Sequence, residues 1–349
     1  STTLEMELNR LSKLLRGQVT GSGRQANFKA ALPELNGLQH TERLMLLLLT
    51  ALCNPFSQWR HFVRVLPDSQ AFQVPWYHWS AELVVQLEGS PAFHYVKHLR
   101  KWFHGASKNV CRFAEGLGLN PLVVLACDQT VVSWLFMIVR TRSFDCPDEK
   151  GALLLPLADM INHSPWGPSF FLPFSSGSGW AGLVAPREMA IGEEIVASYE
   201  DSSNANLLTN YGFLVPGNRH NSVPVPRVAC PIDFEALGSM NQVDGESNAT
   251  YSGAFLIYAD GRPSDELLSA LSDCCRSIVN TKAGFASSNE CTPKLLLRHI
   301  DELLQRYSAD TLSMELARRW PGELDQVNTI VEEEKTILLA ARRAANQGW

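Results

Sequence analysis

The sequence has no apolar run long enough to cross a membrane. Its best candidate, Leu44–Cys53, spans ten residues and is interrupted by Thr50, whereas a membrane-spanning helix needs about 20 apolar residues. We therefore expect a buried helix here and no membrane partner. A basic leader followed by an apolar segment is also missing, so we expect that any targeting segment has been removed or was never there. We predict an intracellular protein, with cytoplasm, nucleus and plastid equally compatible.

An excess of positive charge is missing as well. The 349 residues contain 30 Lys and Arg against 36 Asp and Glu, which gives a formal net charge of −6. Because nucleic-acid-binding proteins usually carry a basic stripe, we expect no nucleic-acid partner. Hydrophobic residues make up 45% and charged residues 19% of the chain, which is typical of globular proteins. The length allows two or three domains.

The eight cysteines form no recognisable framework. They are scattered, with no C-x-x-C pair and no histidine at zinc-finger spacing. Disulfide scaffolds are usually shorter chains with a higher density of cysteine. We therefore predict a reducing compartment, cysteines that are mostly core residues, and no metal site.

Four common catalytic signatures are absent. The sequence contains no G-x-S-x-G, no H-E-x-x-H and no G-x-x-x-x-G-K-[ST], and no G-x-G-x-x-G opens a helix. The sequence therefore lacks the usual evidence for a serine hydrolase, a zinc peptidase, a nucleotide hydrolase or a dinucleotide oxidoreductase.

Hydrophobic periodicity divides the chain into a helical, a β-rich and a second helical part. Apolar residues recur every three or four positions in the first and last parts, which predicts amphipathic helices. Short apolar runs bounded by Pro, Gly and Ser predict a β region over 151–230. This order predicts an α+β fold. The expected helices are 44–53, 59–66, 80–89, 93–103, 129–140, 295–307, 313–320 and 326–345, the expected strands are 152–157, 180–186 and 194–199, and the expected loops include 67–79 and 104–128.

Polar residues gather in three clusters within the β region, at Leu157–Ser164, Gly192–Tyr199 and Ser203–Phe213. Taken singly, an Asn-His pair after a strand is more often a turn cap, and a tyrosine at a strand end is more often a packing residue. The order of the clusters along the chain is more informative than any one of them.

In this order the clusters resemble the signature of the SET-domain protein methyltransferases. That signature is an Asn-His pair after a short strand, then G-E-E/Q-[ILV], then a tyrosine, present here as Asn162-His163, Gly192–Ile195 and Tyr199. Asn204–Phe213 reads N-A-x-L-x-x-x-Y-G-F and is similar to the branch of the Rubisco large-subunit methyltransferases. Further segments similar to this branch are Trp59–Pro67, Trp76–Leu87, Ile257–Arg262, Asp265–Leu268 and Thr329–Lys335.

The resemblance implies a β-rich SET core with a helical insertion, followed by an all-α C-terminal substrate-binding domain. The implied segments are an N-terminal segment 1–40, the insertion 41–140, the SET core 141–220 and the C-terminal domain 221–349. It also implies S-adenosylmethionine as the cofactor. The expected partner is a protein substrate that presents a lysine, such as Rubisco large subunit or another soluble protein, and the enzyme is expected to be a monomer.

The resemblance further assigns roles to six residues. Tyr199 matches the catalytic tyrosine that orients the amine. The implied cofactor-binding residues are Asn162, His163, Arg142 and Tyr211, and the implied substrate-binding residues are Asp159, Tyr199, Tyr211 and Arg142. Two purely structural interpretations stay open: Arg142 could be an ordinary surface arginine, and Asp159 could be a turn cap.

Two further features bear on the reaction. Branch members that methylate histidine are expected to have Trp and Asn where this chain has Ala158 and Ser143, which favours lysine as the acceptor. The family's opening G-x-G strand is not found in residues 1–40, where Gly21–Gly23 lies in polar sequence that predicts a loop. A SET-derived pseudoenzyme or protein-binding module is therefore the alternative hypothesis.

Overall fold

The protein folds into two compact units, each described here by itself. Unit 1 comprises Ser1–Tyr77, Lys97–Glu200 and Asn210–Gly212, and unit 2 comprises His78–Val96, Asp201–Thr209 and Phe213–Trp349. The computed structural model describes residues 6, 10, 35, 37–68, 76, 79–118, 120–146, 151–166, 174–175, 180–181, 184–185, 187–199, 201–225, 255–280, 287–307 and 318–347.

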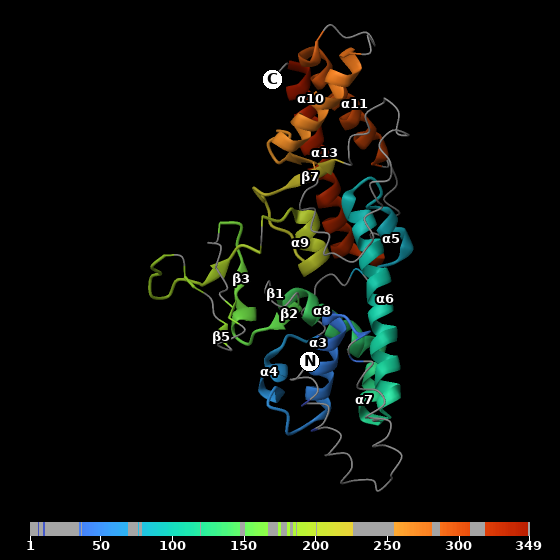
Figure 1. Ribbon diagram of the computed structural model, residues 1–349, viewed down its shortest axis with the longest axis vertical. Helices are drawn as coiled ribbons and strands as arrows, with labels where there is room; N and C mark the ends of the chain where they lie inside the picture. The colour runs from blue at the N-terminus through green and yellow to red at the C-terminus, as the bar shows by residue number, and fades with distance from the viewer. Residues whose placement is uncertain are drawn as a thin grey trace. The chain divides into compact units, whose positions relative to one another are not determined.

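The fold is α+β, with long helices and short strands (Figure 1). None of the described helices combines the length and the apolar character that a membrane span requires. In chain order the elements are α3 (His40–Cys53), α4 (Arg60–Val65), α5 (Ala81–Val85), α6 (Pro91–Leu117), α7 (Asn120–Ala126), α8 (Gln129–Arg142), β1 (Ser143–Cys146), β2 (Gly151–Leu154), the 3-10 helix η3 (Ala158–Met160), β3 (Asn162–His163), β4 (Phe174–Ser175), β5 (Trp180–Ala181), β6 (Val196–Ala197), α9 (Asn204–Tyr211), β7 (Ser222–Val225), β8 (Phe255–Tyr258), α10 (Asp265–Asn280), α11 (Ser288–Arg306) and α13 (Pro321–Gln347).

The helical core of unit 1 is built on α3, which packs against α7, α8 and β2. The predicted helix at 44–53 is confirmed, and its apolar side chains Leu46 and Leu49 are fully buried. Helix α8 begins after Asp128, whose side chain accepts hydrogen bonds from two backbone N–H groups of the first turn. Such an N-cap satisfies donors that a helix start leaves without intrahelical partners.

The prediction of a loop over 104–128 is wrong. Helix α6 continues to Leu117, and α7 occupies most of the remainder. One face of α6 is buried through Phe103, Val110, Phe113 and Leu117, which lie three, four or seven residues apart, as a helical face requires. Glycine and polar residues between these positions lower the helix propensity of the segment, whereas tertiary burial stabilises the helix.

Two disulfides differ from the prediction of a reducing compartment in which the cysteines are mostly core residues. Cys111 is joined to Cys127, and Cys275 to Cys291, by disulfides. The Cα atoms of the pairs lie 4.9 and 5.7 Å apart, within the range that a disulfide spans. Packing of α10 beside α11 creates the second of these proximities, and a spacing of 16 residues reveals neither of them.

The described strands of the β region form two-stranded sheets. Strand β1 pairs antiparallel with β2, and β4 with β5, whereas β3 pairs parallel with β6. The strand expected over 194–199 is shorter than predicted, because only Val196–Ala197 is paired. The parallel pair is the element that positions the candidate site.

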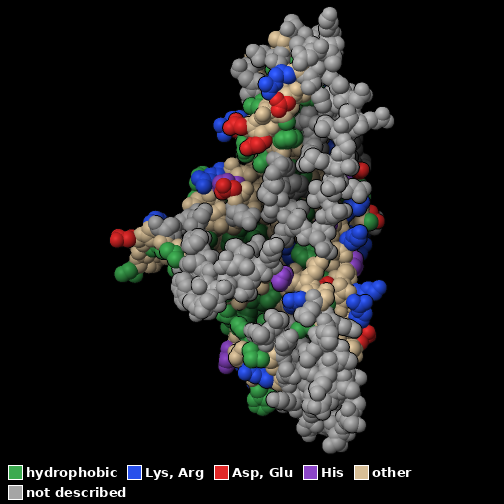
Figure 2. Space-filling model, in the orientation of Figure 1, with side chains coloured by type: hydrophobic (Ala, Val, Ile, Leu, Met, Phe, Trp, Pro, Cys, Tyr) green, Lys and Arg blue, Asp and Glu red, His purple; other side chains and the backbone are tan. Residues whose placement is uncertain are grey.

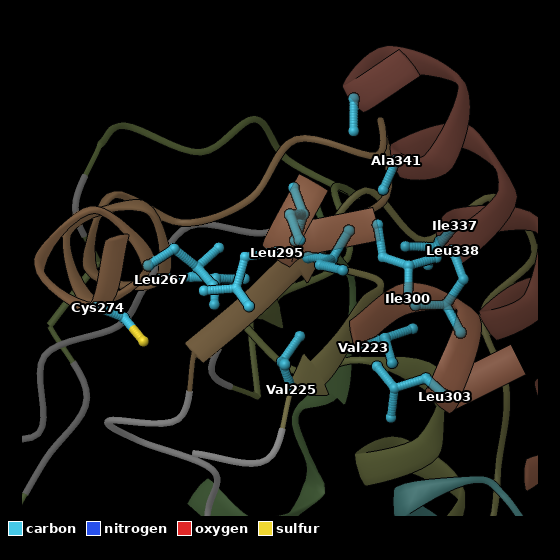
Figure 3. Close-up of a cluster of buried hydrophobic side chains, with 14 of the residues drawn as sticks. Val223, Val225, Leu267, Cys274, Leu295, Ile300, Leu303, Ile337, Leu338 and Ala341 are labelled. Carbon is cyan, nitrogen blue, oxygen red and sulfur yellow. The ribbon is translucent and has the colours of Figure 1, made fainter. Parts of the chain in front are cut away.

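Unit 2 contains a helical core that packs against an antiparallel pair of strands. Helix α10 packs on α11, α11 packs on α13, and the antiparallel pair β7–β8 contacts α13. Figure 3 shows apolar side chains from this strand pair and from all three helices converging on one cluster. Val223, Leu296 and Leu338 in this cluster are fully buried. Burial of such a face contributes the main stabilising free energy of the unit.

Gly261 forms a tight turn against α13. Its φ angle is +82°, and a Cβ atom added there would lie 2.7 Å from the backbone nitrogen of Ala341. We therefore expect Gly261→Ala to lower the free energy of unfolding by about 2–4 kcal/mol, from left-handed backbone strain and overpacking together. Chemical denaturation measures this loss. Gly322→Ala is the matched control, because no atom lies within 4 Å of its added Cβ; an equal loss there would contradict the argument.

A buried carboxyl group connects three segments of unit 2. Glu334 is 4% exposed, and it accepts hydrogen bonds from Ser90 Oγ at 3.1 Å and Tyr307 Oη at 3.0 Å. Burial raises the pKa of Glu334 to about 7, because desolvation outweighs these two hydrogen bonds, which lower it. The folded protein therefore holds this proton more tightly than the unfolded chain does.

This shift predicts a pH-dependent stability. The stabilising contribution of Glu334 to the free energy of unfolding is complete below pH 4.5, the ordinary pKa of a glutamate. It is lost as the pH rises through about 7. Between pH 5 and pH 8 we expect the wild-type protein to lose about 2–3 kcal/mol relative to Glu334→Gln, which does not titrate. Urea denaturation of both proteins at the two pH values measures the difference. A difference that does not change with pH would contradict the prediction.

Candidate functional site

The six residues singled out from the sequence all lie in unit 1. Three come from the segment around β3, one follows β6, and two lie at the C-terminal ends of helices. They are Asp159 in η3, Asn162 and His163 in β3, Tyr199 after β6, Arg142 at the end of α8 and Tyr211 at the end of α9.

The parallel pairing of β3 with β6 brings two of the clusters together. His163 pairs with Ala197, and the backbone N–H of Ser164 donates to the carbonyl of Ala197 at 2.9 Å. Two residues further along, the backbone N–H of Tyr199 donates to His163 Nδ1 at 3.0 Å. Because Nδ1 accepts this bond, the proton of the neutral imidazole lies on Nε2.

Three aromatic rings form the centre of the site. The Tyr199 ring lies 5.2 Å from the His163 ring and 4.8 Å from the Tyr211 ring, both in tilted arrangements. The hydroxyl of Tyr199 donates a hydrogen bond to the carbonyl of Ile161, which fixes its position. We call His163, Tyr199 and Tyr211 the aromatic cluster.

The structure explains why a glycine follows the tyrosine in the Tyr211-Gly212-Phe213 sequence. Tyr211 ends α9, and Gly212 follows with a φ angle of +84°, a conformation that other residues adopt only at a cost. Beside Tyr211, Asn210 accepts a hydrogen bond from Arg140, whose guanidinium also lies 5.0 Å from the centroid of the Trp102 ring. Sequence reasoning missed this support for the end of the helix.

An ion pair lies close to the aromatic cluster. Arg142 Nη1 lies 3.2 Å from Asp159 Oδ2 and donates to the Asp159 carbonyl at 2.8 Å. The Asp159 side chain is 2% exposed, and its Oδ1 is buried with no hydrogen-bond partner among the described residues. Leu157 precedes this segment with a φ angle of +74°, which is strained for a residue with a branched side chain and is often found at functional sites.

The environment keeps Tyr199 protonated. Burial raises the pKa of Tyr199 above its usual value, the positive charge of Arg142 partly opposes this, and the negative charge of Asp159 adds to it. At neutral pH the phenol is therefore an uncharged group that donates one hydrogen bond.

Asn162 is placed differently from the other residues. It is exposed, and its Nδ2 donates to Glu194 Oε1 at 2.8 Å. Within the described part of the chain, its side chain bonds to no member of the aromatic cluster. Sequence reasoning did not assign Glu194 a role, although the second Glu of the Gly192–Ile195 motif was a usable signal. Gly21–Gly23, where the opening strand was sought, lies outside the described residues.

Curated relatives support the predicted resemblance. No protein-family model matches the chain. The chain is 29% identical over 178 residues to the chloroplastic Rubisco large subunit N-methyltransferase of Pisum sativum, covering 47% of this chain and 35% of that protein. It is 25% identical over 246 residues to the chloroplastic fructose-bisphosphate aldolase-lysine N-methyltransferase of Arabidopsis thaliana, covering 66% and 48%. The actin-histidine N-methyltransferase of Canis lupus familiaris is 24% identical over 301 residues, with coverages of 83% and 50%.

Solved structures confirm the fold. The SET domain of LSMT bound to lysine and AdoHcy matches with a TM-score of 0.62 and 18% identity, over 93% of this chain and 79% of that chain. Rubisco LSMT bound to sinefungin and monomethyllysine matches with a TM-score of 0.63 over the same shares. The chain spans about a third to a half of the length of the curated relatives described above. The chain therefore shares the α+β fold of these LSMT structures, with a helical C-terminal part.

Proposed function

We propose that this relative of the Rubisco large-subunit methyltransferases is an S-adenosylmethionine-dependent protein-lysine N-methyltransferase. One observation carries the proposal: a chain with the LSMT fold places His163, Tyr199 and Tyr211 in one cluster beside the Arg142–Asp159 pair. We further propose that the enzyme is intracellular and monomeric and that it acts on a protein substrate. The roles of the six site residues and the boundaries of the four segments, both given in the sequence analysis, belong to the same proposal.

The residues of the site fit the cofactor. S-adenosylmethionine, when bound, supplies a methyl group on a positively charged sulfur that an amine nitrogen can attack. Aromatic faces attract such a cation, and the aromatic cluster provides them. Asn162 offers an amide and a strand backbone at the exposed edge of the site, groups that bind the polar ends of a ligand.

The site also suits a lysine acceptor. A free lysine has a pKa of about 10.4 and must lose its proton before its nitrogen can attack. Partly buried, aromatic surroundings and a neighbouring positive charge both lower that pKa. In our proposal Tyr199 and Tyr211 exclude water and orient the amine, while Arg142 holds Asp159 in place with Oδ1 available to accept a hydrogen bond from the substrate.

Histidine is the second candidate acceptor, because curated relatives include actin-histidine N-methyltransferases. Ala158 and Ser143 stand where the histidine-methylating pattern would place Trp and Asn. The smaller Ala158 side chain leaves more room beside Asp159 for a long flexible chain, which favours lysine.

Calorimetric titration with S-adenosylhomocysteine tests cofactor binding and separates the enzyme from a pseudoenzyme. We expect saturable binding that weakens about tenfold in Asn162→Ala, since loss of one or two polar contacts costs about 1–2 kcal/mol. Gln58→Ala, an exposed amide on another part of unit 1, should bind like the wild type. Absence of binding by the folded wild-type chain would favour the pseudoenzyme, and equal affinities of Asn162→Ala and wild type would remove Asn162 from the site.

A further inference from the structure

A small basic cavity lies between the end of α3 and α4, in the Trp59–Pro67 segment that the proposed methyl transfer does not use. Its volume is about 230 Å³, compared with about 30 Å³ for one water molecule in the liquid. Two arginines, Arg60 and Arg64, line it together with Asn54 and four apolar residues, and no acidic side chain lines it. In Figure 2, basic side chains lie among hydrophobic ones over α4.

The two arginines are neighbours that lack a carboxylate partner. They stand four residues apart on α4, and like charges at this spacing destabilise a helix. Arg60 Nη1 donates to the carbonyl of Pro55 at 3.0 Å. Arg64 makes no ion pair and no hydrogen bond within the described ranges. An anion in the cavity would remove the repulsion between the two guanidinium groups.

Asn54, which also lines this cavity, has a side-chain donor without a partner among the described residues. It is 1% exposed, and its backbone N–H donates to the carbonyl of Thr50 while its own carbonyl accepts from Ser57 N. Its Oδ1 accepts from the backbone N–H of Phe56 at 3.0 Å, which fixes the orientation of the amide. The Nδ2 group is buried and has no partner among the described residues. A buried donor without an acceptor lowers the stability of the folded protein, and a ligand that accepts a hydrogen bond from it would remove this cost.

We propose that this cavity binds a phosphate group. All of its polar side chains, on Asn54, Arg60 and Arg64, are donors. Two guanidinium groups supply two positive charges, which match the dianion of a phosphate monoester better than a single carboxylate, and arginine binds phosphate oxygens through two parallel hydrogen bonds. The phosphate is either free or carried on a phosphorylated side chain of a partner protein, since both present the same chemistry.

The test is a calorimetric titration of the full chain with sodium phosphate in a chloride buffer. We expect saturable binding that weakens at least tenfold in Arg60→Gln and in Arg64→Gln. Arg112→Gln, which removes an exposed charge from α6, should leave the affinity unchanged. Asn54→Asp keeps the acceptor for Phe56 but replaces the donor with a negative charge, so it should abolish binding. Circular dichroism and thermal melting check that each variant is folded.

Two further ligands distinguish the sources and the chemistry. A short phosphoserine peptide that binds more tightly than inorganic phosphate would assign the site to a phosphorylated protein segment, and the reverse order would assign it to a free phosphate; both outcomes support a phosphate site. A glutamate peptide that binds as tightly as phosphate would overturn the phosphate assignment. Absence of saturable phosphate binding by the folded wild-type chain, or equal affinities across the arginine variants, would overturn the site itself.

Discussion

Tyr199→Phe should lower the kcat of methyl transfer by about 10²–10³-fold and change the stability by no more than about 1 kcal/mol. The hydroxyl donates one hydrogen bond, to the Ile161 carbonyl, and loss of one such bond costs about 1 kcal/mol of stability. Loss of a positioned polar group at the reacting centre typically costs two to three orders of magnitude in rate. The ring contacts with His163 and Tyr211 remain in the variant.

Initial rates with the protein acceptor that the wild type labels best measure the effect. Tyr258→Phe is the matched control, because it removes a tyrosine hydroxyl from β8 in unit 2 and should leave kcat unchanged. Unaltered turnover in Tyr199→Phe would remove Tyr199 from the catalytic role. Equal losses in both variants would point to a general effect of removing a hydroxyl.

Arg142→Met should lower the free energy of unfolding by about 3–5 kcal/mol, because it leaves the buried Asp159 carboxylate without its cation. The Asp159 side chain is only 2% exposed and loses both the ion pair and the hydrogen bond to its carbonyl. Removal of one partner from a buried pair has a cost of this size. The double variant Arg142→Met with Asp159→Asn should recover part of the loss, since the unpaired charge is then absent.

Urea denaturation of the two single variants and the double variant gives the coupling free energy directly. The exposed pair of Arg276 and Asp273 provides the comparison, and Arg276→Met should cost less than about 1 kcal/mol. Additive effects at residues 142 and 159 would show that the two side chains act independently, contrary to the geometry.

The order of motifs in the sequence was sufficient to single out the three residues that form the aromatic cluster. A short strand that ends on His163 and a second that precedes Tyr199 are local features, and parallel pairing brings their ends together. Tyr211 ends α9 directly before Gly212, and its ring lies against that of Tyr199. The proximity of the three rings therefore follows from positions that the sequence displays, whereas their roles remain a proposal.

Contacts between distant segments were not predictable in the same way. Glu333, in the Thr329–Lys335 motif, accepts hydrogen bonds from the side-chain amides of Asn204 at 2.8 Å and Asn221 at 2.9 Å. Each motif was visible in the sequence, but nothing in their spacing indicates that they meet. The disulfides and the continuation of α6 were missed for the same reason, because tertiary packing decides them and local propensity does not.

The measurement that tests the proposed function most directly is methyl transfer from isotope-labelled S-adenosylmethionine to soluble protein, followed by mass spectrometry of the labelled residue. Our account predicts N-methyl-lysine in a protein acceptor, formed by the wild-type chain and lost in Tyr199→Phe. Methyl-histidine would contradict the assignment of the acceptor. A folded chain that binds S-adenosylhomocysteine yet labels no protein would contradict the assignment as a methyltransferase.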